Sequence, residues 1–207
     1  MKTILFQGDS ITDAYRGRQG FMHLGIGYPT LIAAELGYNM PGKFNVINCG
    51  ISGNRSVDML SRWKADCINL KPDYLSFLIG VNDTWHEIDF DNGVPVDRYE
   101  TYLRIMVEDA EIALPNTKII LMEPYITHGT ATDKNWNYFR SDIDKRIDVI
   151  NKLCTEHGFP CVHLQQEFDC ALEKAPAENW TQDGVHPTYA GYELIKKAWL
   201  ETFYKTI

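Results

Sequence analysis

Short apolar runs, most of them stopped by glycine or proline, alternate with helix-length segments along all 207 residues. Five of these runs are predicted strands, and none alternates apolar with polar residues as a half-exposed strand does. They cover residues 3–6, 46–49, 74–79, 118–122 and 161–164. Strands of this kind are buried on both faces, so the pattern predicts a parallel sheet covered by helices on each side.

The intervening segments carry apolar residues at helical spacing. Residues 97–114 place one apolar face on a helix that ends before Pro115. Further helices are predicted over residues 29–36, 56–70, 143–154 and 188–204. Since strand and helix alternate five times, we predict an α/β fold with a doubly wound parallel sheet. No repeat, low-complexity tract or linker divides the chain, so residues 1–207 are expected to form one domain.

The ligand crevice of an open parallel sheet lies beyond the carboxyl ends of its strands, here in loops 8–27, 50–56, 80–95 and 123–136. Gly-Asp-Ser at 8–10 follows the first strand and places the Ser10 hydroxyl at a strand-to-helix turn. Asp9 or Ser10 could equally be a simple helix cap. Gly-Ile-Ser-Gly-Asn at 50–54 lets backbone amides approach a ligand, although alone it is more typical of an ordinary turn.

Two further motifs carry polar groups suited to acyl chemistry. Asn82, in Gly-Val-Asn-Asp at 80–83, offers a neutral amide donor at the tip of a central strand, although such pairs also favour turns. Asp183 and His186 stand three residues apart around Gly184, so the carboxylate could hold the imidazole tautomer. A turn that precedes a helix cap would give the same pattern.

In this order, the four motifs resemble the SGNH hydrolase superfamily of GDSL esterases and lipases, especially its bacterial acetylxylan-esterase-like members. The resemblance implies a flavodoxin-like three-layer α/β/α fold with strand order 2-1-3-4-5. It implies a serine esterase in which Ser10 is the nucleophile, His186 the general base and Asp183 its orienting partner. The amides of Ser10 and Gly53 and the Asn82 side chain would form the oxyanion hole. Neither a metal nor an organic cofactor is implied.

The predicted substrate is a short acyl ester, first of all an acetylated sugar such as a xylo-oligosaccharide, because several aromatic residues flank the loops. Candidate substrate-binding residues are Asp9, Arg55, Trp85 and Trp180. A lysophospholipase or acyl-thioester hydrolase is the enzymatic alternative, and a non-catalytic carbohydrate-binding protein is the alternative of another class. An FMN-binding module is disfavoured, because Asp9 puts a carboxylate where a phosphate loop would need neutral donors.

The composition mainly argues against certain classes of binding partner. A net charge of −8, from 28 acidic and 20 basic residues, argues against nucleic acid and anionic membrane surfaces. No apolar run approaches the roughly 20 residues of a membrane span, and no secretory apolar region is visible, so we expect a cytoplasmic protein. The histidines show no metal-ligand spacing, and the family resemblance suggests a homo-oligomer. Five scattered cysteines are expected to be buried thiols: Cys49, Cys67, Cys154, Cys161 and Cys170.

Overall fold

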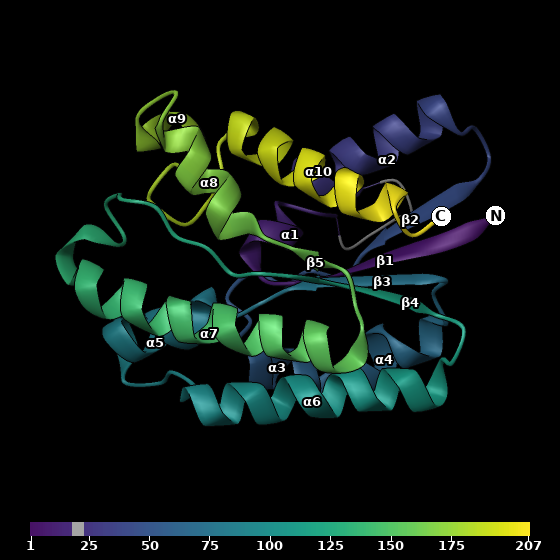
Figure 1. Ribbon diagram of the computed structural model, residues 1–207, viewed down its shortest axis with the longest axis horizontal. Coiled ribbons are helices and arrows are strands. Elements are labelled where there is room, and N and C mark those ends of the chain that lie inside the picture. Colours follow the sequence, from purple (N-terminus) through teal and green to yellow (C-terminus); the bar gives the residue numbers. More distant parts are fainter. Residues whose placement is uncertain (18–22) are drawn as a thin grey trace.

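Five parallel strands form the sheet at the centre of the molecule (Figure 1). The computed structural model describes residues 1–17 and 23–207, so part of the predicted loop 8–27 lies outside the described residues. The sheet order is β2-β1-β3-β4-β5, which confirms the predicted order 2-1-3-4-5. The strands are β1 (Lys2–Gly8), β2 (Phe44–Asn48), β3 (Tyr74–Leu78), β4 (Lys118–Met122) and β5 (Cys161–Val162).

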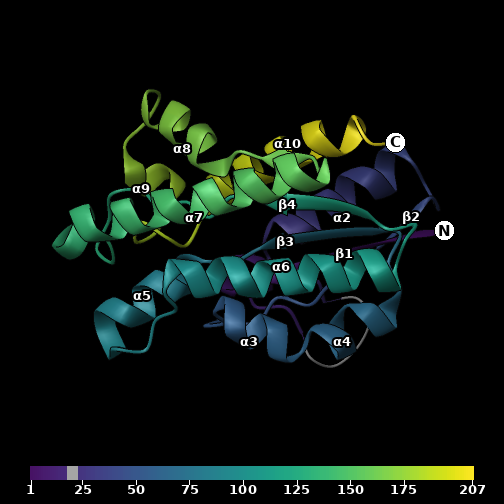
Figure 2. The ribbon, with the colours of Figure 1, turned by 60° about the horizontal axis from the view of Figure 1, so that its bottom comes forward.

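Helices cover both faces of the sheet, giving three layers (Figures 1 and 2). One face is covered by α2 (Tyr28–Asn39), α8 (Leu164–Leu172) and α10 (Tyr189–Tyr204), and the other by α3 (Ser56–Ser61), α4 (Trp63–Asp66) and α6 (Val96–Ala113). The long helix α7 (Trp136–His157) contributes to the hydrophobic clusters on both sides. This arrangement confirms the predicted α/β class.

Successive strand residues point into opposite layers, as the absence of an apolar–polar alternation predicts. In β1, Ile4 and Phe6 belong to the cluster under α2 and α10, whereas Leu5 belongs to the cluster under α6. All three side chains are fully buried. The chain termini lie at one end of the sheet, and the carboxyl ends of the strands point to the other, toward α5 (Val81–Phe90) and α9 (Ala177–Trp180) (Figure 1).

Several predicted boundaries are corrected by the structure. The single helix expected over residues 56–70 is broken into α3, α4 and the 3-10 turn Ile68–Leu70. The first break lies at Arg62. The Arg62 side chain does not extend into solvent, as it would on a regular surface helix, because its guanidinium donates hydrogen bonds to Gln7, Gly8 and Cys49. The fifth strand ends at Val162 rather than at residue 164, because Leu164 begins α8. The helix predicted from residue 143 already begins at Trp136.

Residues 81–90, predicted as part of a loop, form α5. Its sequence lacks a continuous apolar face because Asn82, Asp83 and Thr84 are themselves buried and satisfied by tertiary hydrogen bonds. The pattern also gave no signal for α8 and α9. By contrast, α6 and α10 begin and end within one residue of their predicted limits.

The cysteines differ in exposure. Cys67 and Cys154 are buried as predicted, while Cys49 and Cys161 are half-buried. The prediction is wrong for Cys170, which is exposed because Leu164, Phe168 and Ala171 form the buried face of its helix. No helix in the described part of the chain combines the length and the apolar character needed to cross a membrane.

Candidate active site

Ser10 stands at the abrupt turn between β1 and the short helix α1 (Ser10–Asp13). Asp9 caps this helix, since its Oδ1 accepts a hydrogen bond from the Ile11 amide at 3.0 Å. Gly8 precedes the turn where space is short, because a Cβ there would lie 2.3 Å from Thr12 Oγ1 and 2.5 Å from the Leu78 carbonyl oxygen. The glycine therefore allows the chain to turn tightly and present the Ser10 hydroxyl at the end of the sheet.

The loop before α10 brings an imidazole and a carboxylate to that hydroxyl. His186 Nε2 lies 2.9 Å from Ser10 Oγ, and His186 Nδ1 lies 2.7 Å from Asp183 Oδ2. The other Asp183 oxygen accepts hydrogen bonds from the amides of Val185 and His186 at 2.9 and 2.8 Å. The carboxylate is thus fixed by its own turn, and it orients the imidazole toward a residue 176 positions earlier in the chain.

The charges of this pair favour a basic imidazole. The hydrogen bond that His186 donates to Asp183 raises the pKa of His186 above its ordinary 6.5, against the opposing effect of burial. Burial alone would raise the pKa of Asp183, but the hydrogen bonds from His186 and the backbone outweigh it and lower this pKa. A hydroxyl hydrogen-bonded to such an imidazole can be deprotonated as it attacks a carbonyl carbon.

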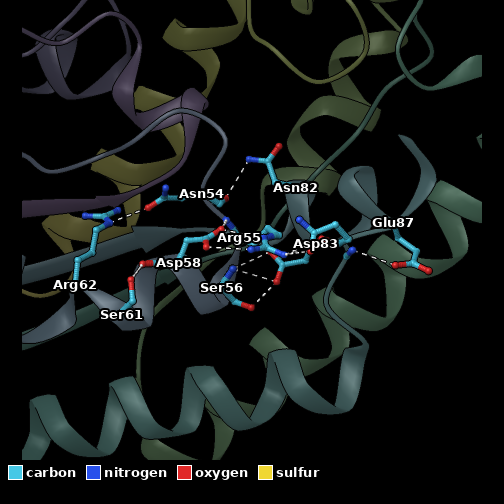
Figure 3. Close-up of polar contacts among 11 residues, drawn as sticks. Asn54, Arg55, Ser56, Asp58, Ser61, Arg62, Asn82, Asp83 and Glu87 are labelled. Atoms are coloured by element: carbon cyan, nitrogen blue, oxygen red, sulfur yellow. Dashed lines mark hydrogen bonds and ion pairs between the residues drawn. The ribbon is translucent and has the colours of Figure 1, made fainter. Parts of the chain in front are cut away.

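Two predicted oxyanion donors, the Gly53 amide and the Asn82 side chain, follow the neighbouring strands β2 and β3. Asn82 follows β3 at the start of α5, and its Nδ2 donates to the Asn54 carbonyl at 3.1 Å (Figure 3). The buried Asp83 carboxylate accepts hydrogen bonds from both the amide and the hydroxyl of Ser56. Together these contacts tie the loop that carries Gly53, where φ is +80°, to the first turn of α5.

These groups open into a cavity of about 750 Å³, which we call the active-site cavity. Ser10, Gly53, Asn82 and His186 all line it, so the fold brings together the predicted hydroxyl, imidazole and oxyanion donors. Asp183 lies behind His186. The remaining lining residues are Asp13, Ala14, Tyr15, Arg16, Ser52, Trp85, His86, Asp89, Phe90, Gln182 and Tyr192.

Of the four predicted substrate-binding residues, only Trp85 belongs to this lining as the structure describes it. Its ring centroid lies 5.8 Å from that of His186. Asp9 is fully buried beneath the site. The Arg55 guanidinium donates hydrogen bonds to Asp58 (Figure 3). It also donates to Asn92, and the Trp180 indole donates to the Ala175 carbonyl.

One wall of the cavity can be recognised from helical spacing in the sequence, but only after the segment is known to be a helix. Trp85, His86, Asp89 and Phe90 recur at helical spacing along α5 and all line the cavity. Once residues 81–90 are known to be helical, these four fall on one face of the helix. No comparable signal identifies Gln182 or Tyr192, which reach the cavity from the turn before His186 and from α10.

Two buried carboxylic acids lie next to the site. Burial raises the pKa of Asp9 to about 7 and that of Asp83 to about 6. Asp83 is compensated by Ser56, as described above, and by the charge of Arg146. Asp9 is less well compensated, since among the described residues none donates a hydrogen bond to its Oδ2.

Outside this cavity, the described part of the chain holds one group of side chains with metal-binding atoms close together. Glu123, Cys161 and His163 place one such atom each within 4.8 Å of the others. Histidine spacing alone did not predict this group, because it combines a single histidine with a glutamate and a cysteine from two different strand segments.

Comparison with known proteins agrees with the fold. Residues 6–194 match the GDSL-like lipase/acylhydrolase family. An acetylxylan esterase from Geobacillus stearothermophilus is 34% identical over 206 residues, which cover 95% of this chain and 91% of that protein.

Solved structures give the same result. A protein from Parabacteroides merdae described as a GDSL-like lipase is 36% identical with a TM-score of 0.90, covering 97% of this chain and 94% of its own. The crystal structure of the Geobacillus stearothermophilus acetylxylan esterase is 32% identical with a TM-score of 0.88, at 97% and 93% coverage. These matches confirm the resemblance drawn from the motifs: the chain belongs to the GDSL-like lipase/acylhydrolase family, of SGNH type, and is a carboxylic ester hydrolase.

Proposed function

We propose that this hydrolase removes acetyl groups from an acetylated carbohydrate of the xylo-oligosaccharide class. The observation that carries the proposal is the chain of hydrogen bonds from Asp183 through His186 to Ser10 at the floor of an aromatic-walled cavity. The volume of about 750 Å³ lies in the usual range for small-molecule sites. The similarity to an acetylxylan esterase supports the choice of acyl group and sugar.

In this proposal the reaction has two steps through an acyl-enzyme. Ser10 Oγ attacks the acetyl carbonyl carbon while His186 Nε2 takes its proton. The tetrahedral intermediate then expels the sugar alcohol, which receives that proton from His186. A water molecule, deprotonated by His186, attacks the acetyl-serine, and acetate leaves as Ser10 regains its proton. Asp183 keeps the imidazole oriented and stabilises its charged form in both steps.

The oxyanion of each tetrahedral intermediate would be held by the amides of Ser10 and Gly53 and by Asn82 Nδ2. The Asn82 amide nitrogen carries two hydrogens, and the Asn54 carbonyl accepts one of them. No described residue accepts the second hydrogen, so it can serve the substrate oxygen. The bond to Asn54 holds the amide plane in place before substrate arrives, which is the kind of preorganisation that stabilises developing charge.

The sugar is expected to lie against the wall formed by Trp85 and Phe90, with His86, Asp89 and Gln182 within reach of its hydroxyls. Aromatic faces and polar edges of this kind suit a carbohydrate ring, which has apolar faces and a polar rim. In contrast, Asp9, Arg55 and Trp180 would act on the substrate only indirectly. We also propose that residues 1–207 form a single hydrolase domain.

The decisive experiment measures acetate release from acetylated xylo-oligosaccharides against a panel of other acetylated sugars. Aryl acetate and aryl octanoate, assayed in parallel, test acyl length. Preferential deacetylation of xylo-oligosaccharides, together with loss of all activity and of fluorophosphonate labelling in Ser10→Ala, supports the proposal. Preference for octanoate would indicate a lipid or thioester hydrolase instead, and absence of labelling in the wild-type protein would indicate a non-catalytic binding protein.

A further inference from the structure

A second cluster of side chains lies at the β4–β5 edge of the sheet and shares no residue with the active-site cavity. Glu123 directly follows β4, Cys161 begins β5, and His163 directly follows β5. Leu121 pairs with Cys161 and Met122 with Val162, so the next pair in register is Glu123 and His163. The Glu123 amide accordingly donates to the Val162 carbonyl at 3.0 Å.

The strand geometry explains why these three side chains meet. Side chains two residues apart on a strand point to the same face, so Cys161 and His163 share one face. Neighbouring residues in register on parallel strands also point the same way, which adds Glu123. Helix α7 packs over this face and supplies Asn151, whose Nδ2 donates to Glu123 Oε1 at 2.8 Å.

The distances within the cluster are close to those of a coordination shell. His163 Nδ1 lies 2.8 Å from Glu123 Oε1, and Cys161 Sγ lies 3.5 Å from Asn151 Oδ1. One potential ligand atom from each of Glu123, Cys161 and His163 lies within 4.8 Å of the others. Ligands at tetrahedral zinc, with bonds of about 2.0–2.3 Å, are about 3.3–3.8 Å apart. Small side-chain rotations are therefore enough to surround an ion.

A cation can reach the cluster from solvent. The His163 side chain is 54% exposed, whereas the Glu123 side chain is only 4% exposed. His163 lines three surface depressions, of about 460, 360 and 450 Å³; Glu123 lines the first, and Cys161 lines the other two. The first depression also carries Asp144, Asp169 and Glu173 against a single cation, Arg140, so its charge favours a metal cation.

We propose that Glu123, Cys161 and His163 bind one Zn²⁺ ion, with water in the fourth position. Thiolate and imidazole ligands select zinc over calcium and magnesium, which prefer oxygen ligands alone. On binding, the Cys161 S–H bond is replaced by an S–Zn bond and the proton leaves to solvent. Asn151 keeps its hydrogen bond to Glu123 and positions that carboxylate. The ion would join the two-residue edge strand β5 to β4 outside the active-site cavity, so it takes no part in ester hydrolysis.

The test uses the full-length protein after treatment with a chelator, titrated with Co²⁺ and then with Zn²⁺. We expect one Co²⁺ per chain, with a thiolate-to-cobalt charge-transfer band and the visible bands of tetrahedral cobalt, both abolished by one equivalent of Zn²⁺. Removal of an outer-shell partner of a bound metal costs about 10–100-fold in affinity. Cys161→Ser and His163→Ala each remove a ligand, so each is expected to weaken binding by at least that factor.

Two matched controls separate this cluster from adventitious binding. Cys170→Ser removes an exposed free thiol that lines the first depression but is not a proposed ligand, and His128→Ala removes a histidine outside the cluster that pairs with Asp133 at 2.7 Å. Both should bind zinc like the wild type, and zinc should raise their melting temperatures, whereas it should not raise that of Cys161→Ser. All four variants should hydrolyse aryl acetate normally, which shows that they are folded.

Three results would overturn the proposal. The first is a wild-type protein that binds no cobalt or zinc in the micromolar range. The second is equal binding by the wild type and Cys161→Ser. The third concerns Cys154, whose thiol neighbours that of Cys161: it is loss of zinc binding in Cys154→Ser while Cys161→Ser retains zinc binding. None of these results bears on the proposed acetyl esterase activity, because the two sites share no residue.

Discussion

Ser10 and the Asp183–His186 pair each stand in a turn that is held by hydrogen bonds between residues two or three apart. Asp9 caps the turn that holds Ser10, and the Asp183 carboxylate is bonded to the amides of its own turn. Each motif therefore carries its local geometry in its own few residues, which is why both were recognisable in the sequence. The 2.9 Å approach of His186 to Ser10 depends on the tertiary fold, because β1 lies inside the sheet between β2 and β3 and α10 packs beside α2.

Asn82 gives the most specific prediction for the proposed oxyanion hole. Asn82→Ala should lower kcat by about 10²–10³, because a donor made for the transition state is lost, while KM changes little. Steady-state kinetics with an aryl acetate measure both constants. Asn82→Asp preserves the shape but replaces the donor with a carboxylate, so it should be at least as damaging. A rise in KM alone would show that Asn82 binds the ground state instead.

The pH profile tests the His186–Asp183 pair. The Asp183 hydrogen bond raises the pKa of His186 above 6.5, and only the neutral imidazole can accept the serine proton. Activity should therefore fall as pH drops through a value above 6.5, measured as kcat/KM against pH. In Asp183→Asn the acid limb should move to lower pH and kcat should fall. An unshifted acid limb in this variant would assign the titration to another group.

At the scale of elements, α5 carries Asn82 and Trp85 into the site, and α7 holds α5 in place. Arg146 on α7 is almost fully buried and donates to Thr84 Oγ1 at 2.9 Å, to the Val94 carbonyl at 2.7 Å and to Asp142 at 2.8 Å. Apolar periodicity in the sequence could not predict this contact between α5 and α7, because the contact is made by polar groups. The sequence pattern consequently predicted the second half of α7 and missed α5.

Two arginine–aspartate pairs on α7 provide a comparison within one helix. Arg146→Ala should lower the free energy of unfolding by about 3–5 kcal/mol, because it breaks a buried ion pair and leaves its partners without a donor. Arg140 pairs with Asp144 at the same spacing of four residues but in solvent, so Arg140→Ala should cost about 0–1 kcal/mol. Urea denaturation measures both. Equal losses would mean that Arg146 contributes no more than a surface pair.

At the scale of the whole molecule, the three-layer packing buries two carboxylic acids at the carboxyl end of the sheet. Burial raises the pKa of Asp9 to about 7, from 3.8 in an unfolded chain. The folded protein thus keeps a proton that the unfolded chain releases. The stabilisation is complete below pH 3.8 and is lost as pH rises through about 7, where the buried group must carry its charge.

Asp9→Asn should therefore become progressively more stable than the wild type as pH rises from about 4 to about 7. The difference should grow by up to about 1.4 kcal/mol per pH unit. The amide oxygen can still accept the Ile11 hydrogen bond, so the helix cap is retained. Urea unfolding at several pH values measures the difference.

Asp58→Asn serves as the control for Asp9→Asn. Hydrogen bonds from Arg55 lower the pKa of Asp58 despite its partial burial, so this substitution should give no gain at neutral pH. A difference between Asp9→Asn and the wild type that does not vary with pH would show that Asp9 remains charged in the folded protein.

The sequence by itself predicted the fold class, the strand order through the family resemblance, and Ser10, Gly53, Asn82, Asp183 and His186 as candidate site residues. These predictions were possible because strand burial, helix spacing and turn chemistry depend on residues that are close together in the sequence. Tertiary structure alone decided that α5 is a helix, that Arg55 and Trp180 are engaged away from the cavity, and that Glu123 meets Cys161 and His163. Those outcomes depend on which polar groups are buried together when the layers pack. Contacts between segments that are far apart in the sequence determine this.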